Sequence, residues 1–145
     1  SCAAFIREAR KAGFGGTFFN VSFVGTQALA DELKTEGAGV MISQVVPFPY
    51  TASVPITREF QAAATKAGSV QTNYSSLEGY LAAKVFTEGL KRAPKNATRE
   101  QLIAGLEWIQ RADFGGFMVD FGTRDHVASS YVDLSMLTGD GKVRR

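Results

Sequence analysis

The sequence predicts an α/β fold in which parallel strands alternate with helices. Helix-like and strand-like segments follow each other through residues 1–46 in the order helix, strand, helix, strand, which predicts parallel pairing through right-handed crossovers. The stretch Gly39–Pro49 begins as a short run of apolar and β-branched residues, which favours a strand buried on both faces. Pro47 and Pro49 then remove hydrogen-bond donors and impose an extended connector, so we expect the chain to change structural unit here.

Length and charge exclude several classes of protein. The 145 residues include 16 Lys and Arg and 14 Asp and Glu, and the net charge of +2 excludes strong electrostatic selection of nucleic acid or of an anionic membrane. No apolar run approaches the roughly 20 residues of a membrane span, and the single Cys2 cannot form an internal disulfide. The chain starts inside a helical pattern at Ser1–Ile6, without an initiator methionine or a signal segment. We therefore expect a fragment whose upstream part, with any signal peptide, is missing.

Residues 1–37 contain two predicted helices around one predicted strand. Gly13 can supply a left-handed cap at the end of the first helix, and Thr17–Val21 has the composition of a short strand. Thr26 is the predicted N-cap of a helix over Gln27–Glu36. Helical spacing predicts that the following side chains face the core: Phe5, Ile6, Ala9, Leu29, Ala30 and Leu33.

Three helices and two strands are predicted in the remainder of the chain. The first helix covers Pro55–Ala67, with the proline in its first turn. Two capping boxes, Ser75–Glu78 and Thr98–Gln101, open the other helices. Alternation over Phe117–Phe121 and the run Tyr131–Leu137 predict strands. The side chains expected to form apolar helix faces are Ile56, Phe60, Leu77, Leu81, Val85, Phe86, Leu90, Leu102, Ile103, Leu106 and Ile109.

The chain has few residues suited to catalysis or metal binding. His126 is the only histidine, and we expect it to help fix a turn with Asp125 rather than to act as a catalyst or ligand. A zinc site needs about four ligands, which one histidine and one cysteine do not supply. Cys2, Trp108 and Tyr80 lie in predicted helices, where we expect Cys2 to be buried and the two aromatic residues to pack. The sequence therefore predicts a protein that is not an enzyme and has no metal or cofactor.

One segment stands where a ligand could bind. Asn20, Ser22 and Phe23 fall at the carboxyl end of a predicted parallel strand, which is the end at which open α/β sheets bind ligands. Ser22 offers a hydroxyl and Phe23 an apolar face, a combination typical of small-molecule pockets. The alternative is an ordinary loop between a strand and a helix, and the pattern alone favours neither.

Several segments, taken in order, carry a resemblance to a known family. They are Ala3–Arg10, Asn20–Gly25, Gly39–Pro47, Leu77–Ala83, Leu102–Leu106, Gly115–Phe121 and Asp125–His126. This ordered set resembles the type I periplasmic solute-binding proteins, and more closely the Leu/Ile/Val-binding branch that supplies ABC importers. The resemblance covers essentially the whole chain. It implies a three-layer α/β fold with an open, mostly parallel sheet flanked by helices, in two lobes of which this chain holds parts.

The resemblance also implies how the chain divides between the lobes. Residues 1–45 would belong to the second lobe, residues 46–115 would complete the first lobe, and residues 116–145 would cross the hinge and return to the second lobe. Two crossings between the lobes would run through Val45–Pro49 and Met118–Phe121. The hinge residues expected on this basis are Val46, Pro47, Val119 and Phe121.

The implied function is that of an extracytoplasmic, periplasmic receptor that delivers a solute to the membrane permease of an ABC transporter. Ser22 stands where the branched-chain amino-acid binders place an acidic residue facing the ligand's ammonium group. Because a serine cannot balance that charge, amides, carboxylates and aromatic acids become candidate ligands beside amino acids. The alternative is a ligand-sensing domain of the same fold in a receptor or transcription regulator. Incomplete sheets would also allow the fragment to form an intertwined homo-oligomer or one compact domain.

Overall fold

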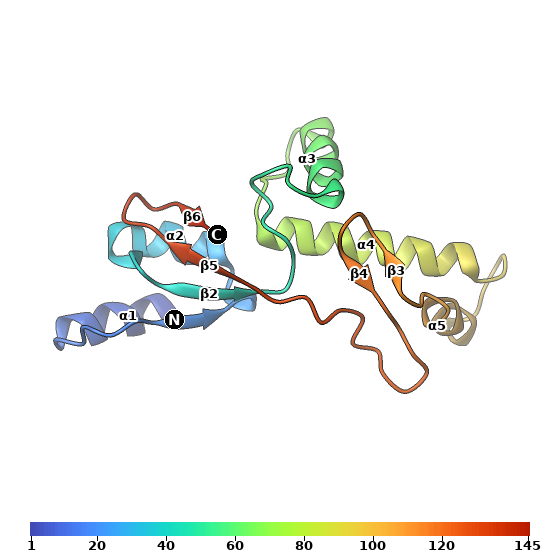
Figure 1. Ribbon diagram of the computed structural model, residues 1–145, viewed down its shortest axis with the longest axis horizontal. Coiled ribbons are helices and arrows are strands. Elements are labelled where there is room, and N and C mark those ends of the chain that lie inside the picture. Colours follow the sequence, from blue (N-terminus) through green and yellow to red (C-terminus); the bar gives the residue numbers. More distant parts are fainter. The chain divides into compact units, whose positions relative to one another are not determined.

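The computed structural model describes residues 1–145 and falls into two compact units (Figure 1). Unit 1 comprises Ser1–Phe48, Asn73–Ser75 and Val132–Arg145, and unit 2 comprises Pro49–Thr72 and Ser76–Tyr131. Helices and sheet strands both occur, so the predicted α/β class is confirmed. None of the helices is both long and apolar enough to cross a membrane.

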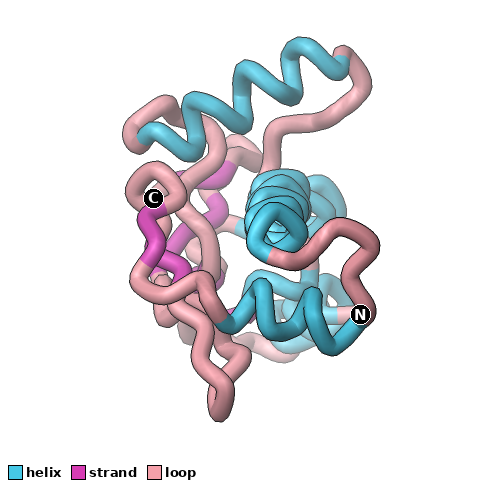
Figure 2. Tube along the Cα trace, turned by 90° about the vertical axis from the view of Figure 1, so that its right-hand side faces the viewer, coloured by secondary structure: helices cyan, strands magenta, loops and turns pink.

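Unit 1 is built on a four-stranded mixed sheet. Its strands, in spatial order, are β1 (Phe19–Val21), β2 (Met41–Gln44), β5 (Asp133–Leu137) and β6 (Val143–Arg144). β1 and β2 are parallel, as the alternation of helices and strands predicts, and α2 (Thr26–Leu33) and the 3-10 turn η2 (Lys34–Gly37) connect them. β5 is antiparallel to β2, and β6 is antiparallel to β5. The strands are short, and loops carry much of the chain (Figure 2).

The two faces of this sheet differ in burial. Ile42, Gln44 and Leu137 are buried on the face covered by α2, whose first residue is hydrogen-bonded to Gln44. On the opposite face Phe19 and Met136 are exposed although both are large and apolar. The expectation that the strand in Gly39–Pro49 is buried on both faces is therefore wrong. Its alternate side chains are only half-buried because the helices of unit 1 cover one face.

Helix α1 (Cys2–Lys11) ends as the sequence predicts. Gly13 has a φ of +89°, its N–H donates to the carbonyl of Arg10, and the N–H of Phe14 donates to the carbonyl of Ala9. These two bonds form a Schellman motif, which requires a residue that tolerates the left-handed region. Arg7 of α1 forms ion pairs with Glu32 of α2 and Glu36 of η2, and these pairs join the three elements.

Two further expectations for unit 1 are wrong. Thr26 does not cap α2: it is the first residue of that helix, and its hydroxyl accepts a hydrogen bond from Gln44 instead. Phe5 does not face the core. Its side chain is 69% exposed while Ile6 is buried, because Phe5 lies at the side of the helix face that contacts the sheet.

Unit 2 combines helices with a short antiparallel hairpin. Its helices are α3 (Pro55–Ala67), α4 (Tyr74–Arg92, whose first two residues belong to unit 1) and α5 (Arg99–Glu107), and its strands are β3 (Ala112–Asp113) and β4 (Met118–Val119). Pro55 is the first residue of α3, as predicted, and Gly68 ends this helix with a φ of +72°. The buried apolar side chains are Ile56, Phe60, Ala64, Leu77, Leu81, Ile109, Phe117 and Val119.

One of the two predicted capping boxes forms. Thr98 Oγ1 accepts from the N–H of Gln101 at 3.3 Å, and the N–H of Thr98 donates to Gln101 Oε1 at 2.9 Å. The box predicted at Ser75 is wrong because α4 already begins at Tyr74, which places this serine inside the first turn. The hydroxyl of Ser76 donates to the carbonyl of Gln71, and this hydrogen bond connects the preceding loop to the helix.

Several large side chains on α4, on α5 and at the C-cap of α5 are exposed, against expectation. Trp108, which we expected to pack, is 73% exposed, and Phe86, Leu90 and Ile103 are also exposed. The two helices approach each other through small residues, since a Cβ atom built on Gly105 would lie 2.6 Å from the carbonyl oxygen of Gly89. The side chain of Leu106 occupies the space over Gly89, so contact between the two helices runs through Gly89, Gly105 and Leu106 and does not include the exposed side chains.

Apart from the short return of residues 73–75 to unit 1, the chain passes between the two units in two regions. It leaves unit 1 after Phe48, within the predicted crossing Val45–Pro49, and Val46 and Pro47 are buried just before this point. It returns between Tyr131 and Val132. A compact unit of this chain is not a lobe of a larger protein, so the lobe boundaries inferred from the resemblance stay predictions.

The later pair of expected hinge residues lies inside unit 2. Val119 belongs to β4 and is buried, and the N–H of Phe121 donates to the carbonyl of Ile109 at 2.8 Å. The second predicted crossing is therefore hydrogen-bonded to Ile109, just after α5, before the chain reaches Val132.

Candidate ligand-binding site

The candidate site lies at the carboxyl ends of the two parallel strands. The register of β1 and β2 pairs Asn20 with Ile42 and Val21 with Ser43, so both strands end at the same edge of the sheet. The 3-10 turn η1 (Ser22–Val24) follows β1 directly, and it is closed by the N–H of Gly25 donating to the first carbonyl of the turn at 2.9 Å. We call this place, defined by Ser22, Phe23 and the end of β2, the carboxyl edge.

The three predicted site residues differ in exposure and bonding. Ser22 is half-buried, and its hydroxyl makes no hydrogen bond within the chain. Phe23 is 87% exposed. Asn20 is half-buried, and its Oδ1 accepts from the N–H of Val21 at 2.9 Å, which leaves the amide nitrogen available. The structure brings Ser22 and Phe23 to the carboxyl edge, while Asn20 faces the helix side of the sheet.

A buried polar network underlies this edge. Gln44 is fully buried, and its Nε2 donates to Thr26 Oγ1 at 2.9 Å and to Ser135 Oγ at 2.6 Å. The hydroxyl of Ser135 donates in turn to the carbonyl of Ile42 at 3.4 Å. Sequence reasoning missed this network. The available signal was a glutamine inside an apolar strand, because a buried polar side chain needs partners.

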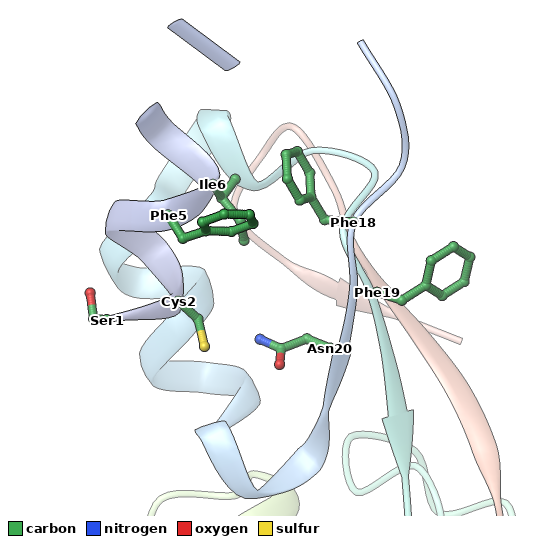
Figure 3. A pocket seen from close by; sticks show the side chains of 7 residues that line it. All are labelled: Ser1, Cys2, Phe5, Ile6, Phe18, Phe19 and Asn20. Atoms are coloured by element: carbon green, nitrogen blue, oxygen red, sulfur yellow. The ribbon is translucent and has the colours of Figure 1, made fainter. Parts of the chain in front are cut away.

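An apolar groove lies between α1 and β1 and was also missed. It has a volume of about 270 Å³ and is lined by Ser1, Cys2, Phe5, Ile6, Phe18, Phe19 and Asn20 (Figure 3). Phe18 and Asn20 point from the strand toward α1, while Phe19 points to the other side. The rings of Phe5 and Phe18 meet edge to face with centroids 6.3 Å apart. Cys2 is exposed beside this groove, which corrects the expectation that it is buried.

The turn that contains the single histidine is fixed by side-chain hydrogen bonds, as expected. His126 Nε2 lies 2.9 Å from Glu107 Oε1, and Asp125 Oδ1 accepts from the N–H of Val127 at 2.8 Å. Both residues are exposed. Nowhere does the structure gather three His, Cys, Asp or Glu side chains that could hold a metal ion.

Tyr80 packs and hydrogen-bonds in unit 2, in agreement with its expected packing role. Its ring lies 5.6 Å from that of Phe60, and its hydroxyl donates to Glu59 Oε1 at 2.6 Å. Burial, and secondly this hydrogen bond, raise the pKa of Tyr80 to about 12. Hydrogen bonds from Lys84 and then Tyr80 lower the pKa of Glu59. The cluster is far from the carboxyl edge in sequence and belongs to the other unit.

Comparisons with known proteins agree with the resemblance. A family model described as periplasmic binding protein matches residues 1–142. The chain is 30% identical to a possible leucine/isoleucine/valine-binding protein from Rhodopirellula baltica SH 1, with a TM-score of 0.90 over 99% of this chain and 39% of that one. It is 31% identical to a substrate-binding periplasmic protein from Ralstonia solanacearum, with a TM-score of 0.85 over 97% and 41% of the two chains.

A third solved structure matches equally broadly. An extracellular ligand-binding receptor from Verminephrobacter eiseniae ef01-2 is 33% identical, with a TM-score of 0.83 over 99% of this chain and 41% of that chain. No curated protein matches the chain. The chain thus spans about two fifths of the length of the solved structures that it resembles. The fold is confirmed as that of the type I periplasmic binding proteins, and this chain corresponds to a part of such a protein.

Proposed function

Since this chain is a member of the periplasmic binding protein family, we propose that it forms part of the solute-binding component of an ABC importer. The solute would be an amino acid or a related small amide, carboxylate or aromatic acid, held between two lobes. The observation that carries this proposal is the carboxyl edge, where an unbonded hydroxyl and an exposed aromatic ring follow a parallel strand. Open α/β sheets bind their ligands at this end of the strands.

The proposed mechanism is closure of the two lobes around the solute. Ser22 and Phe23, with Asn20 beside them, would contribute contacts from the second lobe. Val46, Pro47, Val119 and Phe121 would lie in the hinge. A solute that contacts both lobes binds the closed form more tightly than the open form, and it therefore shifts the population toward closure.

The proposed partners and location follow from this role. The closed form would present the solute to a membrane permease in the periplasm, and the chain would carry out no catalysis itself. No metal or cofactor takes part in this proposal.

Ligand-induced thermal stabilisation of the full-length protein tests the function. At a free solute concentration about 100 times Kd, binding adds about 2.7 kcal/mol to stability, which raises the melting temperature measurably. A panel of amino acids, their amides, aliphatic carboxylates and aromatic acids should contain at least one such solute. If no member of the panel shifts the melting temperature, the proposed function is wrong.

A matched pair of phenylalanine variants tests the site. Phe23→Ala should weaken binding of the solute identified in the panel, because it removes an aromatic contact at the carboxyl edge. Phe86→Ala, at another exposed phenylalanine on α4 in unit 2, should leave binding unchanged. Equal affinity of the two variants would place the ligand elsewhere.

A further inference from the structure

Two uncharged stretches of the sequence meet at the carboxyl edge. Residues 12–30 and residues 37–57 contain no Asp, Glu, Lys or Arg, although 21% of the whole chain is charged. The parallel pairing of β1 with β2 brings these stretches side by side. The connections that leave the edge, Ser22–Gly25 and Val45–Phe48, are therefore both uncharged.

The carboxylates on the sheet, on α2 and on η2 all have partners within unit 1: Asp31 accepts from the side-chain amide of Gln27, and the others pair with arginines. Asp133 is the one carboxylate on the four sheet strands, and its Oδ2 lies 2.6 Å from Arg145 Nε. On α2 and η2, Glu32 and Glu36 accept from Arg7 at 2.8 and 2.7 Å. Arg145 balances Asp133, the one carboxylate on the sheet strands. Glu32 and Glu36 share one arginine, but they follow the start of α2 at Thr26 by six and ten residues, so they lie toward the other end of that helix.

The groups at the edge suit a neutral part of a solute. The hydroxyl of Ser22 makes no hydrogen bond within the chain, so it can both donate and accept. The ring of Phe23 is available for apolar or aromatic contact. An ammonium group closed against this surface would lose water without gaining a carboxylate, and an unpaired buried charge is strongly disfavoured.

We propose that Ser22 and Phe23 make the carboxyl edge select solutes without an ammonium group at this position. This inference rests on the function proposed above and names its substrate class: aliphatic or aromatic carboxylic acids and their amides that lack an α-amino group. Ser22 is the specificity-determining residue, because a carboxylate at its position would supply the missing charge.

Binding of two matched pairs of solutes to the full-length protein tests this selectivity. The pairs are 3-phenylpropanoate with phenylalanine and 4-methylpentanoate with leucine, and the members of each pair differ only in the α-ammonium group. Calorimetric titration should give the deaminated acid of at least one pair a Kd about tenfold lower or better. Ser22→Asp should reverse this order, whereas Thr35→Asp, an equal charge at an exposed position of η2, should not.

The outcomes separate this proposal from the proposed function. If the wild-type protein binds an amino acid as tightly as its deaminated partner, the selectivity proposal is overturned while the solute-binding function stands. If Ser22→Asp leaves the ratio of the two Kd values unchanged, the assignment to Ser22 is overturned. Ser22→Asn changes the same side chain but stays neutral, so it should still bind the deaminated acid more tightly than the amino acid. If Ser22→Asn loses binding altogether, the change seen with Ser22→Asp reflects disturbed structure at this position and the assignment to Ser22 is overturned. If neither these pairs nor the wider panel bind, the function itself fails and the selectivity with it.

Discussion

Replacing Gly105 by alanine should destabilise the protein, although alanine is the better helix former. In the interior of a helix alanine is favoured over glycine by about 1 kcal/mol. The added Cβ, however, would lie 2.6 Å from the carbonyl oxygen of Gly89 and 3.3 Å from the backbone nitrogen of Ala93. Backbone atoms cannot rotate away as a flexible side chain can, so α4 and α5 must separate. Overpacking of this kind lowers the free energy of unfolding by about 1–3 kcal/mol. A clash with backbone atoms should cost about 3 kcal/mol, from which the gain in helix propensity is subtracted. The expected net loss is about 2 kcal/mol.

Urea denaturation of the full-length protein measures this effect against an internal control. Gly79 likewise lies inside a helix, α4 instead of α5, but a Cβ built on it meets no atom within 4 Å. Gly79→Ala should therefore stabilise the protein by about 0.5–1 kcal/mol through helix propensity alone. If Gly105→Ala is as stable as the wild type while Gly79→Ala behaves as expected, the close approach of α4 and α5 is refuted.

Three further predictions follow from named contacts. Thr98→Ala should cost about 1 kcal/mol because Gln101 loses its N-cap acceptor; an unchanged urea midpoint would contradict the capping box. The raised pKa of Tyr80, about 12 against 10.0, means that the unfolded state loses this proton first, so stability should fall as the pH rises from 10 toward 12. Tyr80→Phe should flatten that fall in stability. At the acidic end, the lowered pKa of Glu59 means that the protein should also lose stability as the pH falls through the folded-state pKa of this carboxylate. The 145-residue chain by itself should self-associate through its exposed sheet face, and Phe19→Lys should reduce the molar mass found by light scattering; a wild-type monomer would refute this.

Local patterns predicted those elements whose determinants lie close together in the sequence. The Thr98 box depends on two residues three positions apart, and Pro55 and Gly13 act through their own backbone preferences. Parallel pairing of β1 and β2 was predicted from the alternation of helices and strands, since a long crossover through a helix is the usual connection between parallel strands. Such features need no knowledge of distant partners.

The features that sequence reasoning missed depend on which elements pack against each helix and each strand. Periodicity placed Phe5 and Leu90 on apolar helix faces, but no pattern reveals whether another element packs against those faces. Trp108 is exposed for the same reason. The antiparallel addition of β5 joins residues about ninety positions apart, as the hydrogen bond between Gln44 and Ser135 illustrates. Only the fold brings such groups together.

The buried network of Gln44 explains how an uncharged edge can hold a fixed shape. Its two hydrogen bonds tie Thr26, the start of α2, to β2 and to Ser135 on β5. The residues between β1 and Thr26 are the turn that carries Ser22, so this turn is held at both ends by the sheet. A hydroxyl in a loop that is already ordered loses little conformational entropy when a solute binds. Selectivity at the edge can therefore come from a neutral side chain whose place is set by buried hydrogen bonds beneath it.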